Sequence, residues 1–580
     1  MGIEIKPLKI AIIGGGPSGM FAFKRLLESG KRNFEIDVFE SSKRVGCGMP
    51  YGNEGSNLEH ITNVSDNEIP EIVTHIKEWV STVPNDLLEK FNIDREKFTE
   101  YKVLPRLFFG EYLSAQFEML LERAKELGIT HRIHTGCNVI DVISDSDAKV
   151  VSVLIADKRL FNFDKIIIST GHSFPKVNEG KVDGYYDSPY PPSKLGLKLN
   201  HPVALKGSSL TAIDAIRTLA RENGKFEIEK DNSLRYQASE DSIDFKIVMH
   251  SRNGLLPGIR FHLDDSHLSN AKLLTAKEIA LHISQNDGFL SLDYIFEKDF
   301  KDLFREKKPE FYERIRNYTM EEFVDAMMEM REIIEPFHLF RAEYKEAEKS
   351  IKRRESVYWK EFLAVLSFAM NYPAKHFSAE DMQRLQKKLK PLISIVIAFV
   401  PQSSAEELIA LHNAGRLEII AVGDESKIEI VNDKEIVYIY DENNHTERTT
   451  FKTFIDCVGQ PHLSYNDFPF KSLLNNKNIS SARIKFKSAE KGKEEFSKGK
   501  GNVVQDSSGD FYLTVSGIAI NDNFQIIDQF GAYNEQIYMM AVPYISGYNP
   551  DYSGLDFCSE ASNRIVTSIF SCVPQNVLAG

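Results

Sequence analysis

Three glycines near the start of the chain have the types and spacing needed to bind the pyrophosphate of a dinucleotide. Gly14, Gly16 and Gly19 form the pattern G-x-G-x-x-G. The first glycine permits a tight turn, the second leaves the backbone open to a pyrophosphate, and the third lets a helix pack close to a strand. Glu40 stands where a carboxylate accepts hydrogen bonds from ribose hydroxyls. The residues expected to bind FAD or NAD here are Gly14, Gly16, Pro17, Ser18, Gly19 and Glu40.

A second turn of this kind begins at Gly207, but Ser209 stands at its middle glycine position. A side chain there should hold the pyrophosphate further out, or offer its hydroxyl in place of a backbone contact. The strand that follows ends on Ser251 and Arg252 rather than on a carboxylate, and an arginine there can bind a 2′-phosphate. Arg252 could equally be a solvated surface residue. The simplest interpretation places FAD in the first turn and NADPH in the second.

Each turn needs a strand before it and a helix after it, and the apolar patterns predict both. In the first unit we expect a strand at Leu8–Ile13, a helix at Ser18–Ser29 and a strand at Glu35–Phe39. The second unit repeats this order, with a long polar insertion before its last strand: His201–Lys206, Ala212–Arg221, Arg221–Ser242 and Phe245–His250. The alternation of strands and helices predicts an α/β fold of the Rossmann-like kind.

Between about residues 268 and 389 the pattern becomes helical and densely charged, which predicts an α-helical insertion. Its helices are expected at Met320–Phe337, Leu339–Ile351, Val357–Met370 and Ala379–Lys388. Beyond it we expect strands at Ile393–Phe399 and Leu417–Val422, a hairpin within Lys427–Tyr440, and a loose lysine-rich stretch near Lys485–Lys500. We therefore expect an FAD-binding domain in two parts (1–195 and 460–580), an NADP-binding domain in two parts (196–265 and 392–459), and the insertion at 266–391.

Composition narrows the classes of partner. The 580 residues are too many for one core, so about two to four domains are expected. A net charge of −13 with scattered Lys and Arg argues against a nucleic-acid partner. No signal-peptide pattern precedes the first strand, and the longest apolar run, Leu392–Val400, is too short to span a bilayer, so we expect a cytoplasmic protein with no membrane partner.

The five dispersed cysteines include no C-x-x-C, which disfavours a disulfide reductase, and no His/Cys cluster has metal-ligand spacing. The sequence leaves the oligomeric state open.

Further motifs extend the pattern along the chain: GMPYG at 48–52, HITNV at His60–Val64, LPRLFFGEYL at Leu104–Leu113, an apolar strand ending in Ser-Thr-Gly at Asp164–Gly171, and SRNGLLP at Ser251–Pro257. With the two glycine turns, they make the chain resemble the bacterial FAD/NAD(P)-binding protein family, which is related to the flavin-containing monooxygenases and N-hydroxylases. The resemblance covers nearly the whole chain, including the helical insertion. It implies an α/β flavoprotein with two dinucleotide-binding domains, of the glutathione-reductase type, that binds FAD and NADPH.

The resemblance also implies site residues. In two-dinucleotide flavoproteins a loop after the acidic residue lies beside the flavin, a strand closes the FAD domain with a Thr-Gly turn, and the last helix, here Leu555–Phe570, points its N-terminus at the flavin. The matching residues are Ser41, Gly48, Tyr51, Thr170, Gly171, Gly547, Gly554 and Asp556. A plain buried strand and a helix that merely closes the sheet are the alternatives.

Asn63, within HITNV, matches an asparagine near the reactive face of the flavin in the relatives. A neutral amide there can hydrogen-bond a flavin hydroperoxide without supplying a proton. The alternative is an asparagine that only forms a turn. Arg106 is expected either to face a phosphate or to pair with an acid, and the lone histidines His172 and His262 are more often structural than catalytic.

The cofactors suggest the reaction. We expect an FAD-dependent oxidoreductase in which NADPH delivers hydride to the flavin and a C4a-hydroperoxyflavin then transfers oxygen to a small-molecule substrate. One alternative is an NAD(P)H-dependent flavin reductase or dehydrogenase without oxygen insertion. Another is a non-catalytic FAD-binding protein that senses redox state, which the Ser209 departure slightly favours. No residue cluster identifies the substrate.

Overall fold

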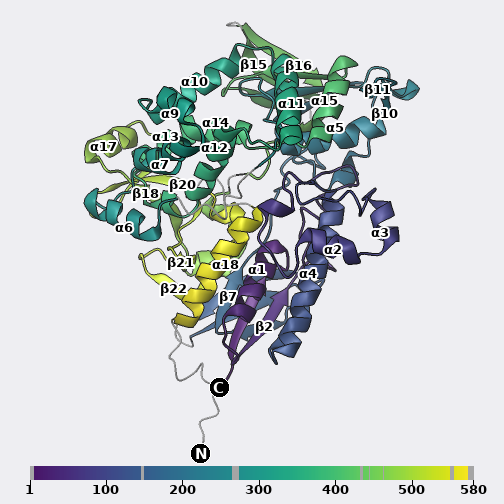
Figure 1. Cartoon of the computed structure of the whole chain (residues 1–580). Coiled ribbons are helices and arrows are strands. Elements are labelled where there is room, and N and C mark those ends of the chain that lie inside the picture. Colours follow the sequence, from purple (N-terminus) through teal and green to yellow (C-terminus); the bar gives the residue numbers. More distant parts are fainter. Residues whose placement is uncertain are drawn as a thin grey trace, which may run out of the picture.

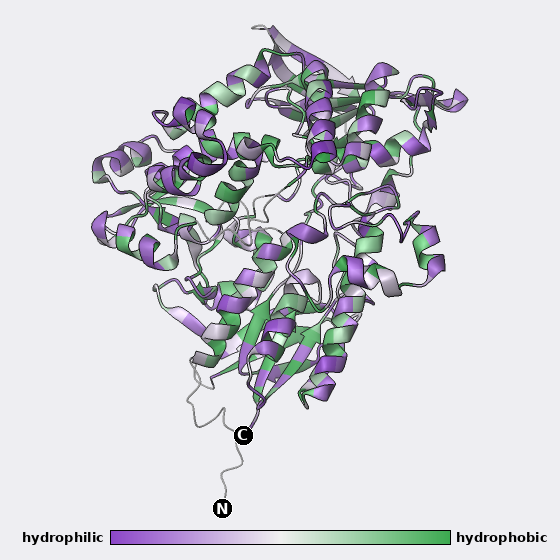
Figure 2. Ribbon diagram, viewed as in Figure 1, coloured by the Kyte–Doolittle hydropathy of each residue, from purple (hydrophilic) through white to green (hydrophobic). Residues whose placement is uncertain are grey.

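The fold was analysed in a computed structural model, which describes residues 6–145, 149–263, 273–431, 435–442, 445–461, 463–548 and 554–571. Two units with parallel sheets occupy opposite ends of the molecule, and a group of helices lies along one side of both (Figure 1). The strands of the lower sheet are mostly hydrophobic, whereas the helix surfaces that face outward are mostly hydrophilic (Figure 2). The amphipathic helices therefore bury their apolar faces against the sheets.

The first unit is built on a six-stranded sheet in the order β21-β22-β7-β1-β2-β3, parallel except where β21 pairs with β22. Its strands are β1 (Leu8–Ile13), β2 (Phe34–Phe39), β3 (Thr130–His134), β7 (Lys165–Ile168), β21 (Gln525–Ile527) and β22 (Tyr533–Met539). Its helices are α1 (Pro17–Glu28), α2 (Ile76–Thr82), α3 (Asn85–Lys90), α4 (Arg106–Glu126), α16 (Lys471–Asn475) and α18 (Gly554–Ser571). The predicted strand–turn–helix–strand at 8–39 is present, and the C-terminal segment returns to this sheet as β21, β22 and α18.

Two three-stranded antiparallel sheets are formed by segments outside the main sheet of the first unit. One contains β4 (Val139–Asp145), β5 (Val150–Ile155) and β6 (Leu160–Phe163). The other contains β18 (Ser481–Lys485), β19 (Val503–Gln505) and β20 (Phe511–Ile518). The stretch that we expected to be loose, Lys485–Lys500, instead forms the end of β18 and helix α17 (Ala489–Ser497). The Ser488 hydroxyl caps this helix by accepting the Lys491 N–H, a local signal that the high lysine content obscured.

The second unit is built on a five-stranded parallel sheet in the order β13-β12-β9-β17-β8. Its strands are β8 (Tyr185–Tyr186), β9 (Pro202–Lys206), β12 (Lys246–Ser251), β13 (Leu417–Ala421) and β17 (Thr453–Asp456), and its helices are α5 (Leu210–Glu222) and α15 (Gln402–Asn413). The polar insertion expected at 221–242 contains a hairpin of β10 (Gly224–Ile228) and β11 (Leu234–Ala238). The hairpin predicted within 427–440 is present as β14 (Lys427–Val431) and β15 (Glu435–Glu442), which β16 (His445–Phe451) extends.

The helical insertion connects the two units. Its helices are α6 (Ala276–Gln285), α7 (Leu292–Asp299), α8 (Phe304–Lys307), α9 (Pro309–Ile315), α10 (Met320–Glu332), α11 (Pro336–Arg353), α12 (Tyr358–Ala369), α13 (Ala379–Arg384) and α14 (Lys390–Val396). Most of its buried residues, such as Phe323 and Leu366, share a hydrophobic core with the first unit. On α11, however, Phe337 and Phe340 pack into the core of the second unit. The insertion therefore contributes side chains to the hydrophobic cores of both units.

The strand predicted at Ile393–Phe399 is wrong, because residues 390–396 form helix α14. The short window of Ile and Val residues suggested a buried strand. The buried positions Leu385, Leu389, Leu392, Ile393 and Val396 nevertheless recur at helical spacing, with a π-helical turn at Leu385–Leu389 joining α13 to α14. We propose that the insertion ends after α14 rather than at residue 391.

Candidate dinucleotide sites and the cavity between them

Two of the three glycines in the first turn are required by the fold itself. Gly14 has a φ of +105°, and a Cβ added there would lie 2.5 Å from the Ser169 carbonyl oxygen. A Cβ added at Gly19 would lie 2.0 Å from the Gly14 carbonyl oxygen, because α1 crosses close over the end of β1. These positions exclude larger residues whether or not a ligand is bound.

Gly16 differs, because the fold does not require a glycine there. Its φ is −77°, which any residue can adopt, and an added Cβ would meet only Gly48 Cα at 3.2 Å and Gly48 N at 3.7 Å. Gly16 directly precedes α1, whose first turn contains Pro17 and Ser18. The N–H groups in the first turn of a helix lack partners within the helix and can bind a phosphate. The missing side chain thus leaves room at a helix N-terminus, which fits a pyrophosphate.

Glu40 lies at the end of β2 and is largely held by the chain. Its carboxylate accepts hydrogen bonds from the Gly15 N–H (2.7 Å), the Ser42 N–H (2.8 Å) and the Ser41 hydroxyl (3.3 Å). A carboxylate has about four acceptor positions, so one remains for a ribose hydroxyl. Just after β7, on the other side of β1 from β2, the buried Thr170 hydroxyl has no hydrogen-bond partner among the described residues. Such an orphaned donor fits a ligand contact.

The N-terminus of α18 lies beside that of α1, as expected for a helix directed at the flavin. The Cys558 thiol contacts the Ser18 hydroxyl at 3.2 Å, and burial raises the pKa of Cys558 to about 12, so the thiol is neutral. Gly554, with a φ of +91°, and Asp556 occupy the first turn of α18. A Cβ at Gly547 would lie 2.1 Å from the Ser516 carbonyl oxygen, so Gly547 serves packing. Residues 549–553, between Gly547 and Gly554, lie outside the described residues.

The second turn repeats the geometry of the first, with the substitution at its middle position. Gly207 has a φ of +111°, and an added Cβ would lie 2.8 Å from the Cys457 carbonyl oxygen. Ser209 is exposed at the N-cap of α5, and its hydroxyl does not cap the helix. The hydroxyl is therefore available to a ligand at the position that corresponds to Gly16.

The end of β12 offers two groups to a second dinucleotide. The buried Ser251 hydroxyl has no hydrogen-bond partner among the described residues. The Arg252 side chain is 67% exposed, and its ion pair with Asp424 is long at 3.8 Å. Its guanidinium is therefore free to reach a phosphate from the loop after β12.

A cavity of about 200 Å³ lies where the two units meet. The residues that line it include Tyr51, Asn63, Arg106, His172, Thr211 and Gln460. They come from the loop after β2, the start of α4, the two connections between the units, and the start of α5. The hydrogen bond found for Asn63 among the described residues is made by its backbone carbonyl and not by its side-chain amide. Asn63, which the sequence singled out, is thus placed at this cavity with its amide available.

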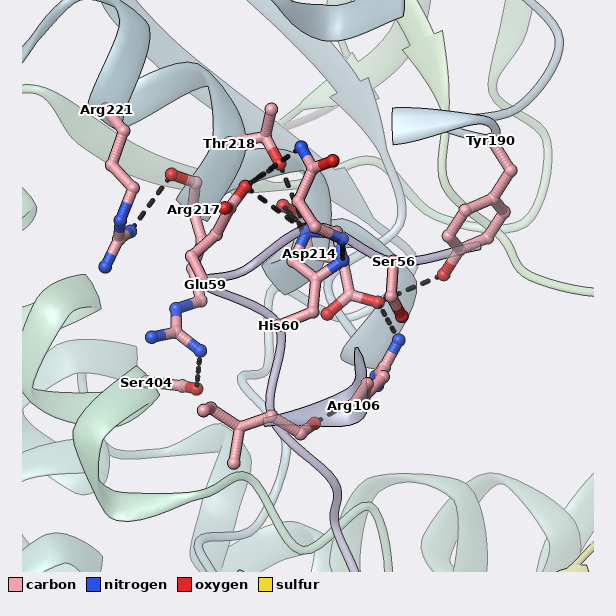
Figure 3. A network of polar contacts seen from close by, with 12 residues as sticks. Ser56, Glu59, His60, Arg106, Tyr190, Asp214, Arg217, Thr218, Arg221 and Ser404 are labelled. Carbon is pink, nitrogen blue, oxygen red and sulfur yellow. Dashed lines mark hydrogen bonds and ion pairs between the residues drawn. The ribbon is translucent and has the colours of Figure 1, made fainter. Parts of the chain in front are cut away.

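An ion pair joins the units beside the cavity (Figure 3). The Arg106 guanidinium donates to the Asp214 carboxylate at 2.5 Å, and the Tyr190 hydroxyl donates to the same carboxylate at 3.1 Å. Burial would lower the pKa of Arg106, but the Asp214 charge more than offsets it, so the pKa is raised above its ordinary value. Of the two roles expected for Arg106, the structure shows pairing with an acid.

His60 belongs to the same network, which sequence reasoning missed. Its Nδ1 accepts the Asn57 N–H at 3.2 Å, so Nε2 carries the proton and donates to the Thr218 hydroxyl at 3.1 Å. Thr218 in turn donates to Glu59 at 2.6 Å. Burial lowers the pKa of His60, which keeps the ring neutral. His60 lay within the quoted HITNV motif, but only the packing of α5 against this loop reveals its partners.

Of the two remaining histidines, His172 also lines the cavity, whereas His262 is not among its lining residues. The His172 ring is 3.0 Å from the Gln460 side-chain oxygen, which also accepts the Ser173 N–H at 2.9 Å, so this pair ties together the two connections between the units. The His262 ring packs at a tilt against Tyr101, with ring centroids 4.8 Å apart. Within the described ranges, no group of three or more His, Cys, Asp or Glu side chains is placed to hold a metal ion. No helix in those ranges has the length and apolar character needed to cross a membrane.

Comparisons with known proteins identify two segments. Residues 11–173 match the family described as FAD-NAD(P)-binding, and residues 275–397 match the family described as YdhS-like middle domain. The uncharacterized protein YdhS of Escherichia coli (strain K12) is 27% identical over 468 residues, which cover 80% of this chain and 85% of that protein.

Solved structures similar to this chain include an N-hydroxylase and a monooxygenase. The ornithine N-hydroxylase of Kutzneria sp. 744 is 12% identical, covering 97% of this chain and 99% of its own, with a TM-score of 0.45. The cadaverine monooxygenase DfoA of Erwinia amylovora is 11% identical, covering 97% of this chain and 94% of its own, with a TM-score of 0.44.

The family match confirms the cofactor class expected from the first glycine turn. It includes the turn, Glu40, the Asn63 loop and β7 with the Thr170-Gly171 turn that follows it. The geometry of these residues, with space at Gly16 and an orphaned hydroxyl at Thr170, fits a bound dinucleotide. Residues 11–173 thus match the FAD-NAD(P)-binding family, and the helical insertion of the same chain matches the YdhS-like middle-domain family over residues 275–397.

Proposed function

We propose that this chain is an NADPH-dependent FAD oxidoreductase that acts as a monooxygenase on a small molecule. The observation that carries the proposal is the cavity between the two dinucleotide-binding units, which Asn63 lines and where the hydrogen bond found for Asn63 among the described residues uses its backbone carbonyl, not its side-chain amide. FAD would be held by the first unit and NADPH by the second, and the ends of both cofactors would approach one another at this junction.

The cofactor contacts follow from the two turns. Gly16 and the N-terminus of α1 would hold the FAD pyrophosphate, and Glu40 a ribose hydroxyl. Arg252 would bind the 2′-phosphate of NADPH by charge-assisted hydrogen bonds. When bound, FAD supplies hydride acceptance from NADPH and, in its reduced form, reactivity toward oxygen.

The residues around the cavity suit a reaction in which an oxygenated flavin must not be protonated by the protein. The Asn63 amide can donate and accept hydrogen bonds but does not release a proton at neutral pH. The positive charge of Arg106 is balanced by Asp214, so Arg106 can orient a polar ligand without placing a net charge in the cavity. The neutral His60 is committed to Asn57 and Thr218 and therefore does not supply a proton to the cavity.

The test compares the purified protein with Asn63→Leu and with Asn162→Leu, a control at an exposed position on β6. The protein is reduced by NADPH without oxygen and then mixed with oxygen while flavin absorbance and released peroxide are followed. We expect reoxidation in two resolved phases in the wild type and in Asn162→Leu. Asn63→Leu should keep its FAD but collapse to one phase with faster peroxide release.

Other outcomes select between the alternatives. Reoxidation of the wild type in a single phase, with and without bound NADP, would contradict the monooxygenase assignment and leave a flavin reductase. Failure of both NADPH and NADH to reduce the flavin would point to an FAD-binding protein without this activity.

A further inference from the structure

We propose that Arg260 is a positioning residue that fixes Asn63 at the cavity from the base of the helical insertion. The inference rests on the role assigned to Asn63 under the proposed function. The contact that carries the inference joins two segments far apart in the sequence: the Arg260 guanidinium donates a hydrogen bond to the Asn63 carbonyl oxygen at 2.5 Å.

The backbone of Arg260 is held where the insertion begins and ends. The Gly258 N–H donates to the Ile395 carbonyl at 2.7 Å, and the Val400 N–H donates to the Gly258 carbonyl at 2.9 Å. The Arg260 N–H then donates to the Val400 carbonyl at 2.9 Å. Arg260 therefore lies on a short pairing of the chain entering the insertion with the chain leaving it.

The side chain of Arg260 reaches from this base into the first unit. Besides the Asn63 carbonyl it donates to the Ser65 hydroxyl at 2.7 Å, and it forms an ion pair with Glu68. Arg260 and Glu68 are each 6% exposed, and Ser65 is 2% exposed. Desolvating such a pair costs about as much as its attraction returns, so its clearest physical effect is geometric.

Asn63 is thereby held between two fixed points. On one side Thr62 exchanges hydrogen bonds with Leu104, through its N–H to the Leu104 carbonyl at 2.8 Å and from the Leu104 N–H to its hydroxyl at 3.0 Å. On the other side Ser65 is bound by Glu68 and Arg260. Because its carbonyl is also bound by Arg260, the backbone of Asn63 is fixed, and with it the point from which the side chain extends at the cavity.

The experiment measures flavin kinetics in Arg260→Met, Arg260→Lys, Asn63→Leu and the double variant Asn63→Leu/Arg260→Met. The matched control is Arg331→Met. Arg331 is also a buried arginine, 5% exposed and paired with Glu343 at 2.7 Å, but it lies within the insertion on α10. Each protein is purified with its FAD, and the rate constant of reoxidation by oxygen and the peroxide released per NADPH are recorded.

We expect Arg260→Met to shift both quantities in the same direction as Asn63→Leu, by about two- to tenfold, as contacting residues do when they act together. Adding Arg260→Met to Asn63→Leu should change them little further. Arg260→Lys should restore part of the wild-type behaviour, and Arg331→Met should lower thermal stability while leaving both quantities unchanged. If Arg260→Met does not fold, partial loss in Arg260→Lys relative to wild type decides the question.

Three results would overturn the proposal, and they separate it from the proposed function. Wild-type kinetics in Arg260→Met beside altered kinetics in Asn63→Leu would remove Arg260 and leave the role of Asn63 standing. Equal effects of Arg260→Met and Arg331→Met would show general destabilisation instead of positioning. Unchanged kinetics in Asn63→Leu itself would remove the role of Asn63, and the role of Arg260 with it.

Discussion

Replacing Gly16 by alanine tests whether that glycine serves the cofactor rather than the fold. The backbone at Gly16 accepts any residue, and the new Cβ would meet Gly48 Cα at 3.2 Å, so the loop must yield by only a few tenths of an ångström. That crowding costs about 1 kcal/mol. The smaller entropy of the unfolded chain offsets about 0.4–1 kcal/mol of it. The folded protein should therefore be within about 1 kcal/mol of wild type.

The effect on FAD binding should be much larger. The Cβ would stand where the pyrophosphate must approach the backbone, and loss of one charge-assisted hydrogen bond costs about 1.5–3 kcal/mol. This corresponds to about a ten- to hundredfold weaker Kd or more. Gly16→Val, with two further methyl groups, should abolish FAD binding.

The assay measures FAD content, the Kd from titration of the deflavinated protein, and thermal unfolding. Gly196→Ala is the matched control, because its φ is −67° and its Cβ would meet only the Ser193 carbonyl at an ordinary 3.4 Å. Gly19→Ala is the opposite control, since a Cβ 2.0 Å from a carbonyl oxygen should prevent normal folding. Folded Gly16→Ala that binds FAD as tightly as wild type would refute the reasoning.

Three further predictions follow from the second unit and its contacts. Ser209→Gly should strengthen the binding of NADPH and NADH equally, whereas Arg252→Ala should weaken the binding of NADPH alone, by about tenfold or more. The rates of flavin reduction by each nucleotide measure both effects. An unchanged ratio of the NADPH and NADH rates in Arg252→Ala would contradict the role assigned to Arg252. Asp214→Asn should destabilise the protein by about 3–5 kcal/mol because the buried Arg106 charge loses its partner, and denaturant unfolding of this variant beside Asp214→Asn/Arg106→Met should show partial recovery in the double variant. Burial lowers the pKa of His250 from 6.5 to about 4, so the unfolded chain takes up a proton before the folded chain does. The free energy of unfolding should therefore fall by about 3 kcal/mol as the pH falls from 6.5 towards 4. His250→Phe should flatten this part of the plot of unfolding free energy against pH, and an unchanged plot would contradict the prediction.

The parts of the site that depend on local sequence could be predicted. The first turn and Glu40 lie within β1, α1 and β2, whose spacing is set by one helix between two strands, and Thr170 follows shortly after the end of β7. The same holds for the second turn, where Ser209 occupies the N-cap as its place in the motif suggested. Such features need no knowledge of how distant segments pack.

The parts that depend on domain arrangement could not be predicted. Arg106 and Asp214 are 108 residues apart, and Arg260 and Glu68 are 192 residues apart, so no spacing rule connects them. Their pairing follows from how α5 and the base of the insertion pack against the loop around Asn63. Helix α14 was mistaken for a strand because a short run of Ile and Val has no periodicity of its own.

The central claim is that the chain uses NADPH to reduce an FAD held by its first unit. The most direct measurement is the visible spectrum of the purified protein, recorded without oxygen before and after addition of NADPH and, separately, NADH. We predict a flavin absorption band that NADPH bleaches faster than NADH does. A purified protein that neither carries nor binds FAD, or whose bound FAD stays oxidised with both nucleotides, would contradict the account.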